Sequence, residues 1–188
     1  MTLGPSSPDG VAAVDRAVQL VDLFCPAVPA FGVITAVGPE QMPAIERMLL
    51  DHHSHMTVAM ERHHGCRLDV RVVAVRNASE GSPGRYAREI LLVRPDGRVV
   101  QYGIVRIDLA AIDTGVAAEI RRADRPLGKV LVEAGLLCDV QHVRLLRIEP
   151  GLHLRGVLSA SGPLSGRVAE ILVGGRPAIE LLEVVAPS

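Results

Sequence analysis

The segment Tyr86-Ala87-Arg88-Glu89-Ile90-Leu91-Leu92-Val93, with the turn Arg94-Pro95-Asp96-Gly97-Arg98 that follows it, decides the fold of this chain. Pro-Asp-Gly between two runs rich in β-branched and other apolar residues is typical of a β-hairpin. The sequence therefore predicts two antiparallel strands, at residues 85–94 and 98–108.

An arginine lies on the apolar face of the first of these strands. Side chains alternate across a strand, so Arg88 shares its face with Ile90 and Leu92. A guanidinium keeps its charge inside a protein, so its burial is costly unless an anion receives it. The pattern indicates that Arg88 binds an anion.

The last predicted strand carries the opposite charge on its apolar face. Glu183 alternates in step with Leu181 and Val185. A buried cation and a buried carboxylate, far apart in sequence, indicate a site for a small polar anion. Two structural explanations stay open at this point. Arg88 and Glu183 could form a buried ion pair, or either strand could turn this face to solvent.

Helical and extended patterns alternate along the rest of the chain. The spacing of apolar residues, with glycine and proline signals, predicts helices at 11–24, 39–50, 54–64, 109–122 and 126–134. Further strands are predicted at 66–75, 138–148, 152–160, 166–173 and 176–185. Strands joined by hairpins form antiparallel sheets, which helices can cover on one face. The predicted fold class is α+β, with residues 1–10 a flexible tail and residues 11–188 a single domain.

Composition sets limits on size, partners and compartment. A chain of 188 residues with 48% hydrophobic residues builds one domain with a full core. A net charge of −1 and 2% aromatic residues provide no basic or stacking surface, so we expect neither nucleic acid nor membrane as a partner. Cys25, Cys66 and Cys138 show no paired spacing, and we see no basic and then apolar leader. These features predict a cytoplasmic protein.

Two motifs that would suit a metal or a cofactor have simpler explanations. The clusters His52-His53-Ser54-His55 and His63-His64 come with no HExxH pattern, cysteine pair or acidic spacing, so a solvated helix end is the favoured interpretation. Gly174-Gly175 lies between two strands rather than before a helix, which predicts a turn and not a nucleotide-binding loop. We therefore expect neither a metal nor an organic cofactor.

Four segments, in order, resemble the chorismate pyruvate-lyase family. They are His55-Met56-Thr57 and the helix that continues to Gly65; Arg88-Glu89-Ile90-Leu91-Leu92 with its Pro-Asp-Gly hairpin; Arg125-Pro126-Leu127-Gly128-Lys129-Val130-Leu131; and Gly174-Gly175-Arg176-Pro177 with the terminal Glu183-Val184-Val185-Ala186-Pro187. Their order and spacing agree from about residue 45 to the C-terminus.

The resemblance implies a fold, a reaction and a set of roles. The fold would be a chorismate lyase-like sheet of about six antiparallel strands with helices packed on one face. The reaction eliminates pyruvate from chorismate to leave 4-hydroxybenzoate, without metal or organic cofactor. The catalytic residues would be Arg88, which takes the ring carboxylate, and Glu183, which reaches the ring oxygen from which the enolpyruvyl group leaves. The backbone N–H of Leu127 would help to hold the carboxylate, and Met56 would line the pocket.

One departure from the family concerns the penultimate strand. Where the family has a run of basic residues, this chain keeps only Arg167, which we expect to contribute to substrate binding. Glu170 occupies another of the basic positions. A carboxylate there is expected to weaken the binding of a dicarboxylate.

Three functions stay open on this basis. The leading interpretation is a cofactor-free lyase of the chorismate pyruvate-lyase type. The second is a relative recruited to bacterial secondary metabolism, which catalyses another elimination or cyclisation on a carboxylated or polyketide-like substrate. The third is a non-catalytic small-ligand-binding domain, similar to the effector domains of some transcription regulators. The expected partner is a small-molecule carboxylate, and the sequence does not distinguish a monomer from a homo-oligomer.

Overall fold

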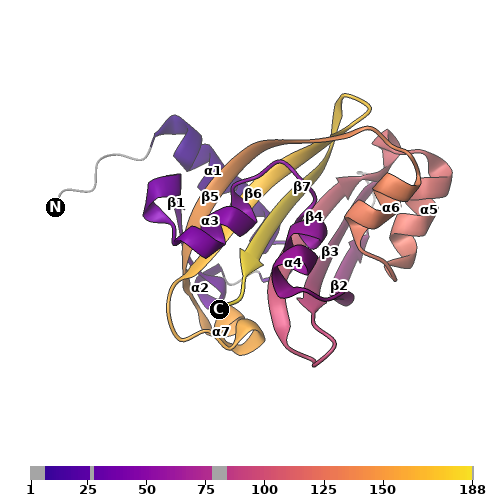
Figure 1. Ribbon diagram of the computed structural model, residues 1–188. Helices are drawn as coiled ribbons and strands as arrows, with labels where there is room; N and C mark the ends of the chain where they lie inside the picture. The colour runs from indigo at the N-terminus through magenta and orange to yellow at the C-terminus, as the bar shows by residue number, and fades with distance from the viewer. Residues whose placement is uncertain (1–6, 26–27, 78–83, 188) are drawn as a thin grey trace.

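Seven strands form one antiparallel sheet in the computed structural model, which describes residues 7–25, 28–77 and 84–187 (Figure 1). They are β1 (Gly32–Val37), β2 (Asp69–Asn77), β3 (Arg85–Val93), β4 (Val99–Asp108), β5 (Cys138–Pro150), β6 (Leu164–Val173) and β7 (Arg176–Val185). Their order across the sheet is β1-β5-β6-β7-β4-β3-β2, and every neighbouring pair is antiparallel. The predicted α+β class, single domain and antiparallel sheet are confirmed. The sheet has seven strands where the resemblance implied about six, and β1 is a strand that the sequence did not predict.

Helices lie on the faces of this sheet. They are α1 (Pro8–Val21), α2 (Val28–Phe31), α3 (Ala44–Leu50), α4 (Met56–His64), α5 (Thr114–Arg122), α6 (Leu127–Glu133) and α7 (Leu152–Leu158), with 3-10 turns η1 (Pro39–Gln41) and η2 (Leu109–Ala111). Helices α3 to α6 pack on one face, as predicted. Leu50 of α3 and Met60 of α4 share a core with Leu92 of β3, and Ile120 of α5 and Leu131 of α6 continue this layer.

The β3–β4 hairpin forms at the predicted turn. The N–H of Arg94 donates to the carbonyl of Arg98 at 2.9 Å, and Gly97 adopts a left-handed φ of 86° that suits glycine. The register sets Arg88 opposite Val105, and the β4–β7 register sets Gly103 opposite Glu183. Directly paired residues share a face, and Val105 and Gly103 are two residues apart on β4, so they share a face as well. Arg88 and Glu183 therefore lie on the same side of the sheet, as predicted.

The opposite face, covered by α1 and α7, buries a carboxylate. Glu89 is 5% exposed, and its Oε1 accepts a hydrogen bond from the hydroxyl of Tyr102 at 2.8 Å. Nε2 of His153, on α7, lies 3.1 Å from the same oxygen. Burial first, and then the carboxylate, raise the pKa of Tyr102, so the phenol stays protonated and donates. The adjacent residues Arg88 and Glu89 therefore place opposite charges on opposite faces.

The strand predicted at 152–160 is wrong, because Leu152–Leu158 form helix α7. Leu154 and Leu158 are one helical turn apart and buried, whereas Leu152 is 83% exposed. Leucines at 152, 154 and 158 fit the period of a strand as well as that of a helix. The helix forms because it buries Leu154 and Leu158 together. The helix ends at Ser159, which has a left-handed φ of 52°.

Other boundaries shift by a few residues. The helix predicted at 39–50 divides into η1 and α3, which has Pro43 at its N-cap. Helix α4 ends at Gly65, whose φ of 64° makes the predicted left-handed cap. Helix α1 begins at Pro8, so residues 8–10 of the predicted tail are helical, while residues 1–6 lie outside the described residues.

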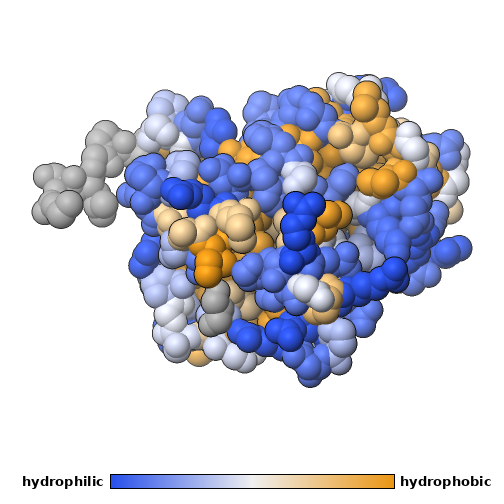
Figure 2. All heavy atoms as spheres, viewed as in Figure 1, coloured by the Kyte–Doolittle hydropathy of each residue, from blue (hydrophilic) through white to orange (hydrophobic). Residues whose placement is uncertain are grey.

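The surface is mostly polar on the face shown in Figure 2. Apolar atoms gather over α3, where Ile45 and Met48 are 45% and 61% exposed (Figure 2). In the part of the chain that the structure describes, no helix has the length and apolar character needed to cross a bilayer.

Candidate functional site

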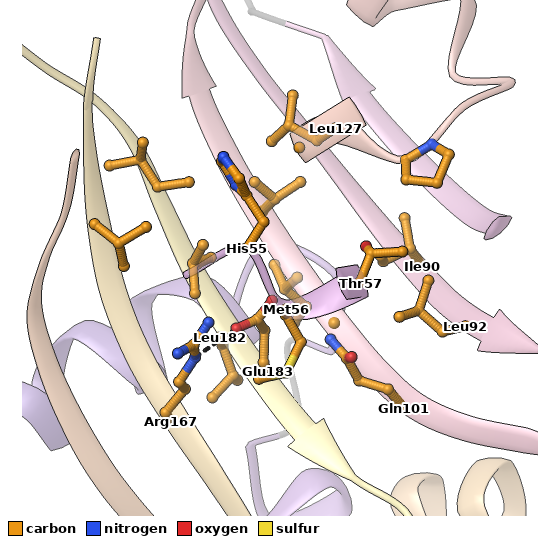
Figure 3. Close-up of a pocket in the computed structure, with 18 of the residues that line it drawn as sticks. His55, Met56, Thr57, Ile90, Leu92, Gln101, Leu127, Arg167, Leu182 and Glu183 are labelled. Carbon is orange, nitrogen blue, oxygen red and sulfur yellow. Dashed lines mark hydrogen bonds and ion pairs between the residues drawn. The ribbon is translucent and has the colours of Figure 1, made fainter. Parts of the chain in front are cut away.

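A cavity of about 70 Å³, partly open to solvent, lies between the sheet and the first residues of α4 and α6 (Figure 3). All five residues singled out in the sequence line it: Met56, Arg88, Leu127, Arg167 and Glu183. They come from α4, β3, α6, β6 and β7, so the fold brings together residues separated by more than half of the chain. Their placement in one cavity is established, and their roles stay predictions.

Arg88 is buried with most of its hydrogen-bonding capacity unused. The residue is 1% exposed, and within the described residues its Nη2 donates to the backbone carbonyl of Arg125, at a long 3.4 Å. The side chain of Tyr86, two residues away on the same face of β3, also interacts with it. Its Nε has no partner among the described residues. Burial lowers the pKa of Arg88, an effect that Tyr86 and Asp124 oppose. An arginine nevertheless stays charged in proteins, so this is a desolvated cation that forms no ion pair within the part of the chain that the structure describes.

Arg167, in contrast, is held by the protein through its Nε and Nη1. Its Nε donates to Oε2 of Glu183 at 2.7 Å, and the two residues are directly opposite in the β6–β7 pair (Figure 3). Its Nη1 donates to the carbonyls of Leu50 at 3.2 Å and His52 at 2.7 Å. The buried ion pair considered for Arg88 and Glu183 is therefore formed by Arg167 and Glu183. Glu183 also lines the cavity, and its Oε1 accepts no hydrogen bond from the described residues.

The first residues of α4 and α6 form the outer wall of the cavity. Neither helix has a side chain that caps its first turn, and the first N–H groups of a helix have no acceptor within it. Leu127, at the start of α6, is where the resemblance expects such an N–H. A Cβ on Gly128 would lie 3.0 Å from Nδ1 of His55, so the two helix ends are in close contact.

His55 is the titratable group nearest to this contact. Burial lowers the pKa of His55; Glu183 opposes the shift and Arg167 adds to it. The imidazole is therefore held toward its neutral form. It lines the cavity above Met56 and points into it (Figure 3).

Apolar side chains form the rest of the wall, and a glycine lies in the floor. The apolar residues include Ile90, Leu92, Val105, Val140, Ile171 and Leu181. Gly103 of β4 is the floor residue, and a Cβ there would come within 3.2 Å of Cγ1 of Ile90. The wall of the cavity is therefore mostly apolar, and Arg88 adds a buried cation to it.

Gln101 also lines the cavity, from β4, and was not predicted as a site residue. It is 2% exposed, and its Oε1 has no hydrogen-bond partner within the described residues. The sequence pattern could have identified Gln101, because it alternates in step with Gly103 and Val105 on an otherwise apolar strand. His55 and Thr57 also line the cavity and were not singled out for it.

Glu170 does not lie at the site. It is paired with Glu180 on the face opposite to Arg167, and its Oε2 lies 3.8 Å from Nε2 of His142. The expectation that Glu170 weakens the binding of a dicarboxylate is wrong for this reason. The charge at the cavity instead comes from Arg88, Arg167 and Glu183, which leaves one net positive charge.

The histidine cluster has individual contacts rather than a shared one. Nδ1 of His53 lies 2.7 Å from the carbonyl of Val140, and Nδ1 of His52 accepts from the N–H of Ser54 at 3.2 Å. Burial lowers the pKa of His52, and Arg167 adds to the shift. Over the described ranges, no three His, Cys, Asp or Glu side chains are arranged to hold a metal ion.

Comparison with known proteins places the fold but no family. No protein-family model matches this chain, and no curated protein matches it. Among solved structures, PhnF from Mycobacterium smegmatis superposes with a TM-score of 0.54 at 14% identity. The match covers 71% of this chain and 64% of PhnF, just under two thirds of that protein. At this identity the likeness shows a shared fold alone.

Two further structures match with lower scores. A GntR-family transcriptional regulator from Bacillus cereus gives a TM-score of 0.47 at 14% identity, over 64% of this chain and 92% of the other. The C-terminal domain of the histidine utilization repressor from Pseudomonas syringae pv. tomato gives 0.45 at 14% identity, over 64% and 92%. The sheet and its helical layer match the chorismate lyase-like fold that the sequence predicted.

Proposed function

We propose that this chain binds a small organic anion in the cavity, with the anionic group on Arg88. The observation that carries the proposal is the buried guanidinium of Arg88: among the described residues its Nε has no hydrogen-bond partner, and its Nη2 makes a long contact of 3.4 Å. A desolvated charge without a counter-ion is costly, so a charge-assisted contact with a carboxylate would offset that cost. The apolar wall would take the body of the molecule.

A chemical step on the bound molecule is the second candidate. It is supported by the five residues of the chorismate pyruvate-lyase resemblance, which line one cavity. In that reaction Arg88 and the N–H of Leu127 would hold the ring carboxylate, and Oε1 of Glu183 would reach the ring oxygen. Aromatisation of the ring supplies the driving force, so the protein would contribute mainly orientation. The binding proposal holds whether or not the molecule is converted.

Two measurements on one preparation test both candidates. Calorimetric titration with 4-hydroxybenzoate measures binding to the wild type, to Arg88→Met and to the control Arg106→Met. Arg106 is a cation of β4 on the opposite face, paired with Glu180 at 2.6 Å. We expect binding to the wild type and the control, and weak binding to Arg88→Met. Equal affinity in all three would contradict the proposal.

The chemical step is tested by incubation with chorismate, followed at the absorbance of 4-hydroxybenzoate. Product formation that disappears in Glu183→Gln supports a lyase. Binding of 4-hydroxybenzoate without turnover of chorismate supports a domain that binds small ligands and rejects the lyase.

A further inference from the structure

Gln101 turns its amide nitrogen toward the cavity and its amide oxygen into the protein. The residue lines the cavity and is 2% exposed. Its Oε1 is buried without a hydrogen-bond partner among the described residues, whereas its Nε2 is directed toward Met56 and the middle of the cavity (Figure 3). Nε2 carries two N–H groups, and it donates neither of them to the described residues. The group that Gln101 offers to a bound molecule is therefore a hydrogen-bond donor.

The side chains that flank Gln101 in the sheet are apolar. Its neighbours across the strands are Leu92 on β3 and Val185 on β7. Gly103, two residues further along β4 on the same face, has no side chain. A buried donor without an acceptor destabilises a protein, so an acceptor on a bound molecule would be favourable here.

The Gln101 end of the cavity has no cation of its own. The charged side chains among the described lining residues are Arg88, Arg167 and Glu183. Arg167 is paired with Glu183 at 2.7 Å, so Arg88 carries the net positive charge. A second carboxylate beside Gln101 would be desolvated without a counter-ion. A neutral carbonyl oxygen would accept a hydrogen bond from Nε2 without that cost.

The volume of the cavity favours a short molecule. A volume of about 70 Å³ is room for roughly five to seven water-sized groups. Arg88 is paired with Val105, four residues along β4 from Gln101, and both Arg88 and Gln101 line this one cavity. A carboxylate and a carbonyl joined by a few carbon atoms would fill the volume between them.

We propose that the molecule bound in this cavity is a short monoanion with a neutral carbonyl group, an oxo acid, and that the amide N–H of Gln101 donates to its carbonyl oxygen while Arg88 holds its carboxylate. The inference rests on the proposed function and narrows its ligand class. Chorismate is a dianion, and 4-hydroxybenzoate has no carbonyl besides its carboxylate, so this class differs from both.

Three acids of nearly the same shape test the inference by calorimetric titration of the whole chain. 4-Oxopentanoate carries a carboxylate and a ketone. 4-Methylpentanoate has a methyl group in place of the ketone oxygen, and succinate has a second carboxylate in place of the acetyl group. We expect the wild type to bind 4-oxopentanoate most tightly, because only this acid is a monoanion with an acceptor. Its advantage over 4-methylpentanoate should be about two- to tenfold, the range of one hydrogen bond.

Variants at Gln101 identify the residue responsible. Gln101→Met keeps the length of the side chain and removes both N–H groups. The affinities for 4-oxopentanoate and 4-methylpentanoate should then become equal, with that for 4-methylpentanoate retained. Arg106→Met, on the opposite face of the sheet, is the control and should keep the wild-type preference. Gln101→Leu replaces Gln101→Met if a melting curve shows that the methionine variant does not fold.

The outcomes separate this inference from the proposal on which it rests. Equal binding of 4-oxopentanoate and 4-methylpentanoate to the wild type overturns the inference and leaves anion binding intact. So does tighter binding of succinate, or a preference for the ketone that persists in the Gln101 variants. Affinity for 4-methylpentanoate that is unchanged in Arg88→Met overturns the proposed function instead. A wild type that binds 4-hydroxybenzoate but none of the three acids overturns the inference alone, and one that binds none of the four overturns both.

Discussion

Two arginines on the same face of the sheet are equally buried and differently used. Arg88 on β3 and Arg167 on β6 are each 1% exposed. Arg167 donates to a carboxylate at 2.7 Å and to two carbonyls, whereas the backbone hydrogen bond of Arg88 among the described residues is long, at 3.4 Å, and no carboxylate there pairs with it. Burial of a charge is therefore not by itself the mark of a binding site. The mark is hydrogen-bonding capacity that the protein leaves unused.

The difference follows from what the sheet places beside each residue. The neighbour of Arg167 across β6 and β7 is Glu183. The neighbours of Arg88 are Val75 on β2 and Val105 on β4, which offer it no acceptor. Arg167 therefore stabilises the wall of the cavity, whereas Arg88 is the residue that we propose contacts the ligand.

The largest expected effect is on folding, through Arg167. Arg167→Met leaves Glu183 as an uncompensated carboxylate and frees the carbonyls of Leu50 and His52. Breaking one side of a buried pair costs about 3–5 kcal/mol, so the free energy of unfolding should fall by that amount. Chemical denaturation measures it. Arg106→Met, which breaks a more exposed pair, is the control and should cost about 1 kcal/mol. Equal losses in the two variants would show that the Arg167–Glu183 pair stabilises the fold no more than the more exposed Arg106–Glu180 pair does.

Arg88→Met should behave in the opposite way. Removal of a buried charge without a counter-ion is expected to leave the free energy of unfolding unchanged or to raise it. Affinity for 4-hydroxybenzoate should fall by about one to three orders of magnitude, because a desolvated charge contact is worth about 2–5 kcal/mol. Arg88→Lys should not restore it, since an ammonium cannot reproduce the guanidinium fork. A marked loss of melting temperature with normal affinity would make Arg88 a scaffold residue too.

Glu183→Gln tests the Arg167–Glu183 pair by changing its acidic partner. The amide keeps the shape but replaces a charged acceptor for Arg167, so stability should fall by about 1–3 kcal/mol. The cavity then carries a second uncompensated cation, and affinity for 4-hydroxybenzoate should hold or increase. Any turnover of chorismate should fall. Loss of affinity comparable with that of Arg88→Met would show that Glu183 itself binds the ligand.

The smallest effect is the pH dependence contributed by the histidines beside Arg167. Burial lowers the pKa of His52 and His55 below the ordinary value of about 6.5. The unfolded chain then binds more protons just below that value, so stability decreases as the pH falls through it. Melting temperatures between pH 7.5 and 5.5 should show this slope, and the double variant His52→Gln, His55→Gln should reduce it. An unchanged slope would contradict the shift.

The strands that form the site could be predicted from the alternation of apolar residues. The register between β6 and β7 could not be predicted. Arg88 and Glu183 could be assigned to apolar faces because their strands have clear alternation. Arg167 could not be paired from the sequence, because counting back from the Gly174-Gly175 turn sets Leu182 opposite Arg167. A bulge between Ile171 and Leu172 shifts the register by one and brings Glu183 there. A bulge has no reliable sequence signal.

Two other differences have distinct causes. Gln101 could have been found by the reasoning applied to Arg88, since it alternates with Val105 on an apolar strand. Helix α7 could not be separated from a strand, because seven residues with leucines at 152, 154 and 158 satisfy both periods. The choice is made by the tertiary contacts of Leu154 and Leu158 beneath the sheet.

The adjacent charges of β3 also bear on how the chain finds its register during folding. The apolar run Ile90-Leu91-Leu92 would fit either face, so a slip of one residue would cost little in hydrophobic contact. The slip would, however, exchange Arg88 and Glu89, placing the carboxylate in the cavity and the guanidinium against Tyr102 and His153. Each would be buried away from its native surroundings, which is expensive. Arg88, which we propose binds a ligand in the folded protein, would therefore also disfavour a misaligned hairpin during folding.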